Sequence, residues 1–367
     1  MNYNEKLIFY LLRRGLHTEN KASFEFEDTT DWDVIFDCCS DQGVLGIVSD
    51  GIDTMNEEGL IPEKHQFSHN MKMQWGYNVM NIEKTFIHQF KVSSMLADEY
   101  AKGNIRTVVL KGFSIARMYP KPFHRPCGDL DCFLMGDYEK GNIIAERLGA
   151  DVNRNLYKHS HIELKHLTVE NHQFCTAIRG SDRYKDFERL LQKILRETEL
   201  RPIKNTKLLS PNPLFNALFL TIHSWGHFMD EGIKIRHICD WTVLMEKHIN
   251  DIDWGKFVEF LNQRDKKIIR FAECISVISN KYIGAPLPDI FKQRKCPDIL
   301  VEKVLENVFR KYDSIHVTSI PRWKIRLLIV RNYFISNWKY KEFSEESAIR
   351  HTLNSIISFL FERNPHL

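Results

Sequence analysis

The spacing of the hydrophobic residues in this chain changes near residue 105, and it changes back after residue 180. On both sides of this segment, apolar residues recur every three or four positions, which is the period of amphipathic helices. Within it, RTVVL (residues 106–110) and DLDCFL (residues 129–134) are short apolar runs of the kind that form buried strands. This order predicts an α+β fold in which a small mixed sheet with helices is set between two helical regions.

Capping and turn residues indicate where several elements end. Thr30 is a candidate N-cap, Ser68 is another, and Gly103 with Asn104 is a natural end for the helix that starts at Ser68. Further along, NLYKHSHIEL and LTVENHQFCTAI alternate around Lys165 and His166, as the two strands of an antiparallel hairpin would.

A chain of 367 residues is long enough for two or three packed units. We place an N-terminal helical region at residues 1–104, an α/β core at 105–200 and a C-terminal helical domain at 201–367. The net charge of +3 gives no general attraction to nucleic acid or to a membrane. Eight cysteines without C-x-x-C spacing indicate free thiols and a reducing compartment. No apolar run is long enough to span a bilayer, so we expect a cytoplasmic protein.

Two aspartates stand one residue apart in the apolar run DLDCFL. Residues i and i+2 of a strand point to the same face, so Asp129 and Asp131 would aim their carboxylates together while Leu130 and Cys132 face the core. Two such carboxylates repel unless something positive lies between them, and Mg²⁺ prefers oxygen ligands of this kind. An acidic pair on a solvated strand face without any function is the plainer alternative.

Other residues strengthen the metal interpretation. Glu170 is an isolated acidic residue in LTVENHQF, and if its strand lies beside that of Asp129 the three carboxylates can hold two metal ions about 4 Å apart. Upstream, Gly112 sits at a turn between a strand and a short helix, where backbone amides can approach a phosphate. Candidate phosphate partners nearby are Lys111, Ser114 and Arg125, although either charged residue can also be an ordinary surface charge.

The segment LKGFSIARMYPKPFHRPCGDLDCFL resembles the core of the DNA polymerase β-type nucleotidyltransferase superfamily. More closely, it is similar to a bacterial branch known as nucleotidyltransferase family 5. The shared features are listed here as they stand in this chain: Lys111-Gly112, Tyr119-Pro120, Arg125, Asp129-Leu130-Asp131 and Val169-Glu170-Asn171-His172. The histidine-containing helix and the following Arg-x-x-x-Asp helix, here with Arg236 and Asp240, extend the resemblance to about residue 245.

The resemblance implies a polymerase β-like fold and transfer of a nucleoside monophosphate from a nucleoside triphosphate (NTP) to an acceptor hydroxyl, with release of pyrophosphate. Two Mg²⁺ or Mn²⁺ ions would be bound by Asp129, Asp131 and Glu170, the last either as general base or only as a ligand. Lys111, Gly112, Ser114 and Arg125 would hold the nucleotide. The chain departs from the superfamily's usual Gly-Gly or Gly-Ser turn in having Phe113 after Gly112.

Several histidines and arginines have less specific surroundings. His159 and His161 share a strand face, either in the cleft or on a polar hairpin surface. His223 and His227 have the i, i+4 spacing of zinc ligands on a helix, but no third ligand at a useful spacing is evident. We therefore expect them to line the cleft or to hydrogen-bond in the core. Arg236 is predicted to pair with Asp240 on the helix surface, or to reach a phosphate.

Two other functions remain open. One is a nucleotide-binding or regulatory protein without turnover. The other is a toxin-type nucleotidyltransferase that modifies tRNA and docks it on the basic, aromatic segment PRWKIRLLIVRNYFISNWKY (residues 321–340). That segment is explained equally well as a packing helix with a basic edge. The acceptor (small molecule, protein or RNA), the base preference and the oligomeric state do not follow from the sequence.

Overall fold

The computed structural model describes residues 1–17, 24–178, 182–230, 232–294, 296–310 and 337–350. In these residues seven strands form one mixed sheet in the order β3-β4-β5-β2-β1-β7-β6. The strands are β1 Thr107–Val109, β2 Leu130–Phe133, β3 Asp151–Asn153, β4 His159–Leu164, β5 Leu167–His172, β6 Arg201–Pro202 and β7 Leu208–Ser210. The α+β class predicted from the hydrophobic spacing is confirmed.

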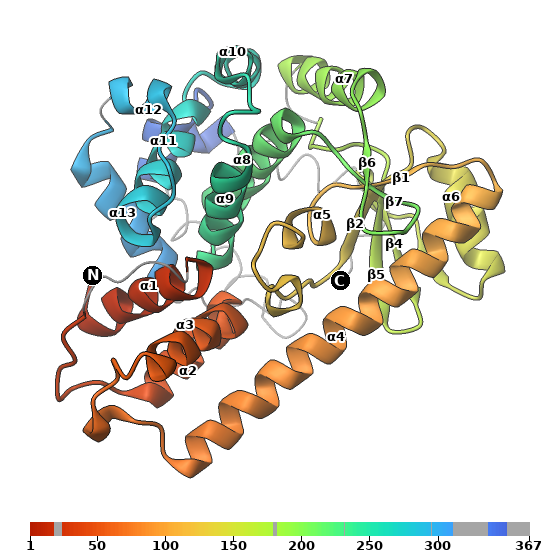
Figure 1. Cartoon of the computed structure of the whole chain (residues 1–367). Helices are drawn as coiled ribbons and strands as arrows, with labels where there is room; N and C mark the ends of the chain where they lie inside the picture. Colours follow the sequence, from red (N-terminus) through yellow and green to blue (C-terminus); the bar gives the residue numbers. More distant parts are fainter. Residues whose placement is uncertain (18–23, 179–181, 231, 295, 311–336, 351–367) are drawn as a thin grey trace, which may run out of the picture.

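Helices surround this sheet (Figure 1). Those before the sheet are α1 Tyr3–Leu16, α2 Trp32–Gln42, α3 Leu45–Glu57, η1 Glu63–His65 and α4 His69–Lys102. Those between strands are α5 Phe113–Ala116, η2 Pro122–His124, α6 Tyr138–Arg147 and α7 Asp182–Glu197. Those after the sheet are α8 Pro213–Asp230, α9 Ile235–His248, α10 Trp254–Arg264, α11 Ile268–Ile278, η3 Ser279–Ile283, α12 Asp289–Arg294 and α13 Asp298–Phe309.

The strands at the centre of the sheet combine parallel and antiparallel pairs. β2 runs parallel to β5 and antiparallel to β1, whereas β1 runs parallel to β7. The β4–β5 hairpin turns at Lys165 and His166, which have φ of 48° and 62°. Two successive residues with positive φ are typical of the tight turn whose twist matches that of the flanking strands. The predicted hairpin is therefore confirmed.

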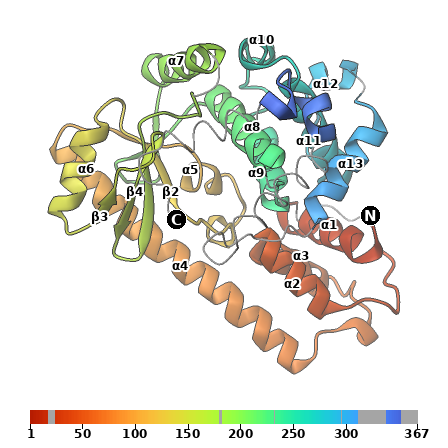
Figure 2. The same ribbon diagram turned by 180° about the vertical axis from the view of Figure 1, so that it is seen from behind.

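The long helix α4 and the shorter α6 cover one face of the sheet, and α4 continues past the sheet to the N-terminal helices (Figures 1 and 2). Leu96 and Tyr100 of α4 pack with Leu130 and Cys132 of β2 in one buried cluster. Alternate strand residues such as Val108 and Phe133 belong to a second cluster, which also contains residues of α8 and α9. The sheet is thus buried on both faces, because α8 and α9 stand on the side away from α4.

The N-terminal helices pack against the C-terminal ones, so the two helical regions meet around the sheet unit. Phe9 of α1 lies 5.3 Å from Tyr282 and 5.8 Å from Phe309, measured between ring centroids. Both partners lie after the sheet, Tyr282 in η3 and Phe309 at the end of α13. One buried cluster therefore joins the predicted residue ranges 1–104 and 201–367.

Most predicted helix ends are confirmed, with one shifted by a residue. Ser68 caps α4 by accepting from the amide of Met71, and Gly103 ends that helix. The cap of α2, however, is Asp31 and not Thr30, since the Asp31 carboxylate accepts from the amides of Asp33 and Val34. The Thr30 hydroxyl instead donates to the backbone oxygen of Glu27.

The sheet extends past the core boundary predicted at residue 200, because β6 and β7 add a short hairpin at its edge. All eight cysteines are free thiols, as predicted. In the described part of the chain no helix is both long and apolar enough to cross a membrane. Most of the basic segment 321–340 lies outside the described residues, so its predicted docking role stays a prediction.

Candidate functional site

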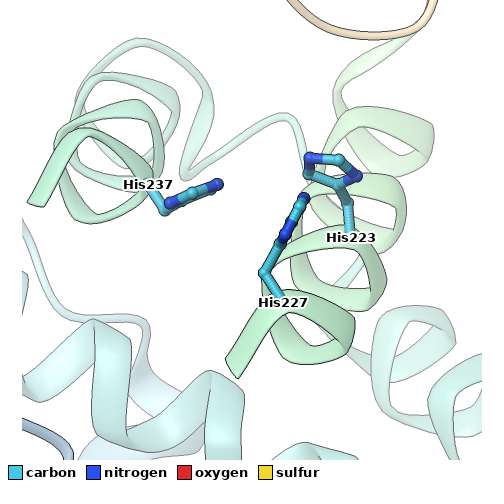
Figure 3. A group of neighbouring side chains, drawn as sticks. All are labelled: His223, His227 and His237. Atoms are coloured by element: carbon cyan, nitrogen blue, oxygen red, sulfur yellow. The ribbon is translucent and has the colours of Figure 1, made fainter. Parts of the chain in front are cut away.

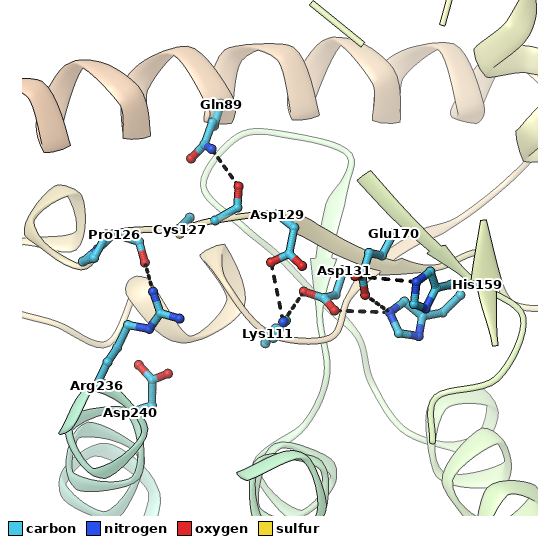
Figure 4. A network of polar contacts seen from close by, with 12 residues as sticks. Gln89, Lys111, Pro126, Cys127, Asp129, Asp131, His159, Glu170, Arg236 and Asp240 are labelled. Carbon is cyan, nitrogen blue, oxygen red and sulfur yellow. Dashed lines mark hydrogen bonds and ion pairs between the residues drawn. The ribbon is translucent and has the colours of Figure 1, made fainter. Parts of the chain in front are cut away.

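Three carboxylates meet at the centre of the sheet. Asp131 on β2 is the direct cross-strand neighbour of Glu170 on β5, and Asp129 immediately precedes β2. One carboxylate oxygen of each lies within 4.8 Å of the others. The sequence predicted this set on the condition that the two strands are adjacent, and that condition is met (Figure 4).

The strand alternation that was predicted accounts for their orientation. Leu130 and Cys132 are fully buried against α4, so the residues between and beside them face the other way. The side chain of Asp131 is only 3% exposed, whereas those of Asp129 and Glu170 are 30% and 24% exposed. The acidic set is therefore closed at Asp131 and open to a ligand at its other two members.

A lysine lies between the two aspartates. Nζ of Lys111 is 3.0 Å from Oδ2 of Asp131 and 3.5 Å from Oδ1 of Asp129. Burial would lower the pKa of Lys111, but the charges of Asp131 and Asp129 raise it above its ordinary value. Lys111 therefore stays an ammonium ion and supplies the positive charge that two carboxylates on one face require.

A histidine supplies the second positive charge. Nε2 of His172 lies 3.2 Å from an oxygen of Asp131 and 3.2 Å from an oxygen of Glu170. Burial and the charge of Lys158 would lower the pKa of His172, yet the hydrogen bonds to both carboxylates raise it. The protonated imidazole can therefore donate from Nε2 to either carboxylate.

The pKa values of the three carboxyl groups differ because their neighbours differ. Burial would raise the pKa of Asp131, but the Lys111 charge and the His172 hydrogen bond hold it well below its usual range. Burial would raise the pKa of Glu170, but its hydrogen bond with His172 and the charges of His159 and His172 together lower it. Burial and the nearby Asp131 charge raise the pKa of Asp129. Asp129 is thus the member whose charge a bound cation would stabilise most.

His159 belongs to the same group, whereas His161 does not. Nε2 of His159 lies 3.6 Å from Glu170, and burial lowers the pKa of this histidine to about 4, so it is neutral near pH 7. The imidazole of His161 lies 2.9 Å from the exposed Glu163 on the same strand. Of the two histidines predicted on this strand face, His159 lies at the acidic set, whereas His161 is the cross-strand partner of Glu170 but turns its ring to Glu163.

The glycine turn before α5 has the backbone that the sequence suggested. Gly112 has a φ of 59°, in the left-handed region that glycine adopts without steric cost. Phe113 points away from the acidic set and packs edge-on against Phe86 and Phe90 of α4. The departure from a Gly-Gly or Gly-Ser turn therefore adds a core contact, and Gly112 itself is buried.

Ser114 lies deeper than a phosphate-binding hydroxyl would. It is fully buried, and its Oγ is 2.8 Å from Oγ of Ser210 at the end of β7. This contact joins α5 to the sheet edge. In the described structure the Ser114 hydroxyl therefore holds the turn in place from inside the protein.

Arg125 is buried in an ion pair that the sequence did not indicate. Its Nε and Nη2 lie 2.9 and 2.7 Å from the two oxygens of Asp240 on α9, and the Tyr119 hydroxyl donates to the same carboxylate over 2.7 Å. The predicted pairing of Arg236 with Asp240 is wrong, because Asp240 is engaged by Arg125. Arg236 is half-buried and donates to the backbone oxygen of Pro126 over 3.4 Å.

The loop that leads to Asp129 is thus held from two sides (Figure 4). From α9, Arg236 bonds to the loop directly and Asp240 holds it through Arg125. From α4, the amide nitrogen of Gln89 donates to the backbone oxygen of Gly128 over 2.9 Å. Helices from both flanks therefore fix the position of the first carboxylate.

The structure corrects the expectation that His223 and His227 have no third partner. His237, in the first turn of α9, has a ring nitrogen within 4.8 Å of ring nitrogens of both. His223 is also close enough to the acidic set that the Lys111 charge, after burial, lowers its pKa. The predicted position of His223 beside the site is consistent with this contact.

Sequence reasoning missed several residues of the site. His172 follows Glu170 at i+2, so strand alternation alone places both on one face. Lys158 immediately precedes β4, and no local sequence pattern marks it as a site residue. Burial lowers its pKa, although the charges of Asp131 and Glu170 oppose this shift. Gln89 contacts a loop 39 residues further along the chain, and His237 meets His223 and His227 only because α8 and α9 pack together, so no local pattern predicts these contacts.

The donor set fits hard divalent cations. Mg²⁺ and Mn²⁺ prefer carboxylate oxygens and share their coordination with water and phosphate oxygens. Asp129, Asp131 and Glu170 offer such oxygens within one small region, and two of them are accessible. The ammonium of Lys111 and the imidazolium of His172 lie where they neutralise the same oxygens when no cation is present.

Comparison with known proteins gives one match. A family model described as an uncharacterised nucleotidyltransferase matches residues 28–268, about two thirds of the chain. The match spans α2 to the first residue of α11, and so includes the whole sheet, the acidic set and the three histidines of α8 and α9. No curated protein and no solved structure matches the chain.

Proposed function

The chain belongs to this family of uncharacterised nucleotidyltransferases, and on that premise we propose that it is a metal-dependent enzyme acting at the acidic set. It would transfer a nucleoside monophosphate from an NTP to the hydroxyl of an acceptor. The observation that carries the proposal is the convergence of Asp129, Asp131 and Glu170 from two paired strands. The short mixed sheet and the turn at Gly112 also support a polymerase β-type core.

The carboxylates of the acidic set and the neighbouring Lys111 would have different roles in the reaction. Asp129, Asp131 and Glu170 would hold two Mg²⁺ or Mn²⁺ ions, which supply positive charge to the triphosphate and to the leaving group. Lys111 lies at the carboxylates and has a four-carbon side chain, so it can turn from them to a phosphate oxygen when a cation replaces it. Catalysis would rest on fixed charges and positioning more than on covalent chemistry.

In the reaction, the acceptor oxygen attacks the α-phosphorus and forms the new P–O bond. The bond from that phosphorus to the bridging oxygen breaks, and pyrophosphate leaves with the bonding electrons. The hydroxyl proton goes to Glu170 or to solvent. Glu170 has a lowered pKa and is ionised near pH 7, which suits a ligand and also allows it to act as a base.

The direct test is pyrophosphate release from each NTP in the presence of Mg²⁺ and representatives of the three acceptor classes: small hydroxyl compounds, protein and RNA. We expect release in the wild type and a loss of about 100-fold or more in Glu170→Gln, the scale seen when one group that stabilises a transition state is removed. Glu163→Gln is the matched control, since Glu163 is an exposed carboxylate on the neighbouring strand β4.

The same experiment separates the alternatives. Release that needs RNA would favour a tRNA-modifying enzyme, and Mg²⁺-dependent NTP binding without release from any acceptor would favour a regulatory protein. Equal release by the wild type and Glu170→Gln would remove the acidic set from the mechanism.

A further inference from the structure

Helices α8 and α9 bring three histidines together on the side of the sheet away from α4. His223 and His227 stand one turn apart on α8, so their side chains share a helix face. His237 lies in the first turn of α9 and points its ring toward them (Figure 3). The ring centroids are 4.6, 5.5 and 6.0 Å apart, and one ring nitrogen of each lies within 4.8 Å of the others.

The surroundings keep at least two of these imidazoles neutral. Burial and the Lys111 charge hold the pKa of His223 well below its ordinary value. Burial and the Arg236 charge lower the pKa of His237 to about 3. Neutral imidazole is the form that binds metals, because its unprotonated nitrogen offers a lone pair. No proton has to leave either ring before a cation binds near pH 7.

The backbone also orients one of the rings. The backbone amide of Lys234 donates to Nδ1 of His237 over 3.1 Å, and the backbone oxygen of the same residue lies 3.3 Å from that nitrogen. Because Nδ1 is held by the backbone of Lys234, Nε2 is the ring nitrogen left to take part in a metal site. Contacts to the second ring nitrogen of this kind fix the orientation of a ligand's ring.

We propose that His223, His227 and His237 form a binding site for one zinc-class divalent cation. Three imidazole ligands leave a fourth position for water or another ligand, which is a common arrangement for zinc in enzymes. With zinc–nitrogen distances of about 2.0–2.1 Å, a tetrahedral site puts its nitrogens about 3.3–3.4 Å apart. On binding, the three side chains would turn toward one another to reach this separation.

This site differs in chemistry from the acidic set. Imidazole nitrogens suit zinc, cobalt, nickel and copper, whereas the three carboxylates suit magnesium and manganese. The two sites are neighbours, since Lys111 and Asp131 both act on the pKa of His223. The proposal does not depend on nucleotidyl transfer, because it rests on the histidine geometry alone.

Metal binding by the full-length chain tests the proposal. The protein is stripped with a chelator and titrated with Co²⁺ in excess Mg²⁺, so that the acidic set is occupied and visible absorption reports cobalt bound by nitrogen. We expect one Co²⁺ per chain, displaced by one Zn²⁺. Losing a residue that only supports a metal ligand costs up to about 100-fold in metal affinity. His227→Ala and His237→Ala each remove a ligand itself, so each should weaken Zn²⁺ binding by more than about 100-fold.

His248→Ala is the control, since His248 lies at the other end of α9 and interacts with Asp251. It should bind Co²⁺ as the wild type does. Circular dichroism shows whether each variant is folded. Because His227 and His237 lie on different helices, a single variant that folds is enough to test the proposal. The proposal is overturned if the wild type binds no Co²⁺ under these conditions, or if a folded ligand variant binds it as tightly as the control.

Discussion

At the scale of single residues, the candidate site contains its own counter-ions. Lys111 lies between two carboxylates and His172 lies between Asp131 and Glu170. The carboxylates were predictable, because D-x-D on an apolar strand and an isolated glutamate are local patterns. The neutralising contacts were not, since the distance from a lysine to two aspartates depends on how the strands pair.

Lys111→Met should make Mg²⁺ a stronger stabiliser of the protein. Without the Lys111 ammonium group, Mg²⁺ has no competitor for the oxygens of Asp129 and Asp131. Mg²⁺ therefore binds more tightly to the nucleotide-free protein. A ligand present at about 100 times its Kd adds about 2.7 kcal/mol to the free energy of unfolding. Thermal unfolding with and without Mg²⁺ measures this difference, and the rise in Tm should be larger in the variant.

Lys102→Met serves as the control, because Lys102 is an exposed lysine that pairs with Glu99 on the surface of α4. Its response to Mg²⁺ should match that of the wild type. A smaller response in Lys111→Met than in this control would show that Lys111 assists cation binding, contrary to our assignment.

Arg125 should contribute more to the free energy of unfolding than a surface charge does, because it is buried in an ion pair with Asp240. Arg125→Ala leaves the buried Asp240 carboxylate without its main charge partner, which in buried pairs costs about 3–5 kcal/mol. Urea unfolding measures this loss. Arg154→Ala, which breaks a more exposed pair with Glu146, should cost about 1 kcal/mol or less. Equal costs would mean that the Arg125 pair contributes no more than a surface contact.

At the scale of secondary-structure elements, two glycines let α1 and α3 approach closely. A Cβ on Gly15 would lie 2.1 Å from the backbone oxygen of Ile47, and a Cβ on Gly51 would lie 2.0 Å from that of Leu11. Both obstacles are backbone atoms that cannot turn aside as a side chain can. The two helices must separate to accept either methyl group.

Gly51→Ala should therefore destabilise the protein by about 1–3 kcal/mol, the usual cost of overpacking a core. Gly76→Ala is the matched control, because Gly76 lies exposed within α4 with open space around it. Replacing a glycine by alanine at such a helical position stabilises by about 0.4–1 kcal/mol. Chemical denaturation of both variants checks the pair, and a stabilising Gly51→Ala would contradict the packing described.

The elements also differ in how far the sequence predicts them. The ends of α4 and the turn at Lys165 and His166 follow from local caps and turn residues, and these predictions are confirmed. Strand β6 is only Arg201–Pro202 and has no apolar run, and β7 offers only the pair Leu208 and Leu209. The two strands form because β7 pairs with β1, 101 residues earlier, and only the folded chain shows that pairing.

At the scale of the whole molecule, the loop before the acidic set connects all parts of the fold. His124 in η2 places Nδ1 2.9 Å from Asp50 of α3 and Nε2 2.8 Å from Glu83 of α4. Lys121 pairs with the same Asp50. The N-terminal helices thus hold the segment that α9 holds from its other end through Arg125.

The His124 contact predicts a pH dependence of stability. Burial would lower the pKa of His124, but the hydrogen bonds to Asp50 and Glu83 raise it above the ordinary 6.5. The folded state therefore holds this proton more tightly than the unfolded state. Its contribution to stability is complete below pH 6.5 and is lost as the pH rises through the folded pKa.

Comparing the wild type with His124→Gln isolates this contribution. The free energy of unfolding, measured from pH 5.5 to 8.5, should show a difference between the two proteins that is largest at low pH and shrinks as the pH rises. A difference that stays constant across this range would mean that His124 is not held protonated by its two carboxylates.

The central claim is that the carboxylates on β2 and β5 bind a metal–nucleotide complex. Calorimetric titration of each NTP, with and without Mg²⁺, tests it on the wild type, on Asp129→Asn/Asp131→Asn and on the Glu163→Gln control. We predict binding that requires Mg²⁺, persists in the control and disappears in the double variant. Binding without Mg²⁺, or equal binding by a folded double variant, would contradict the claim.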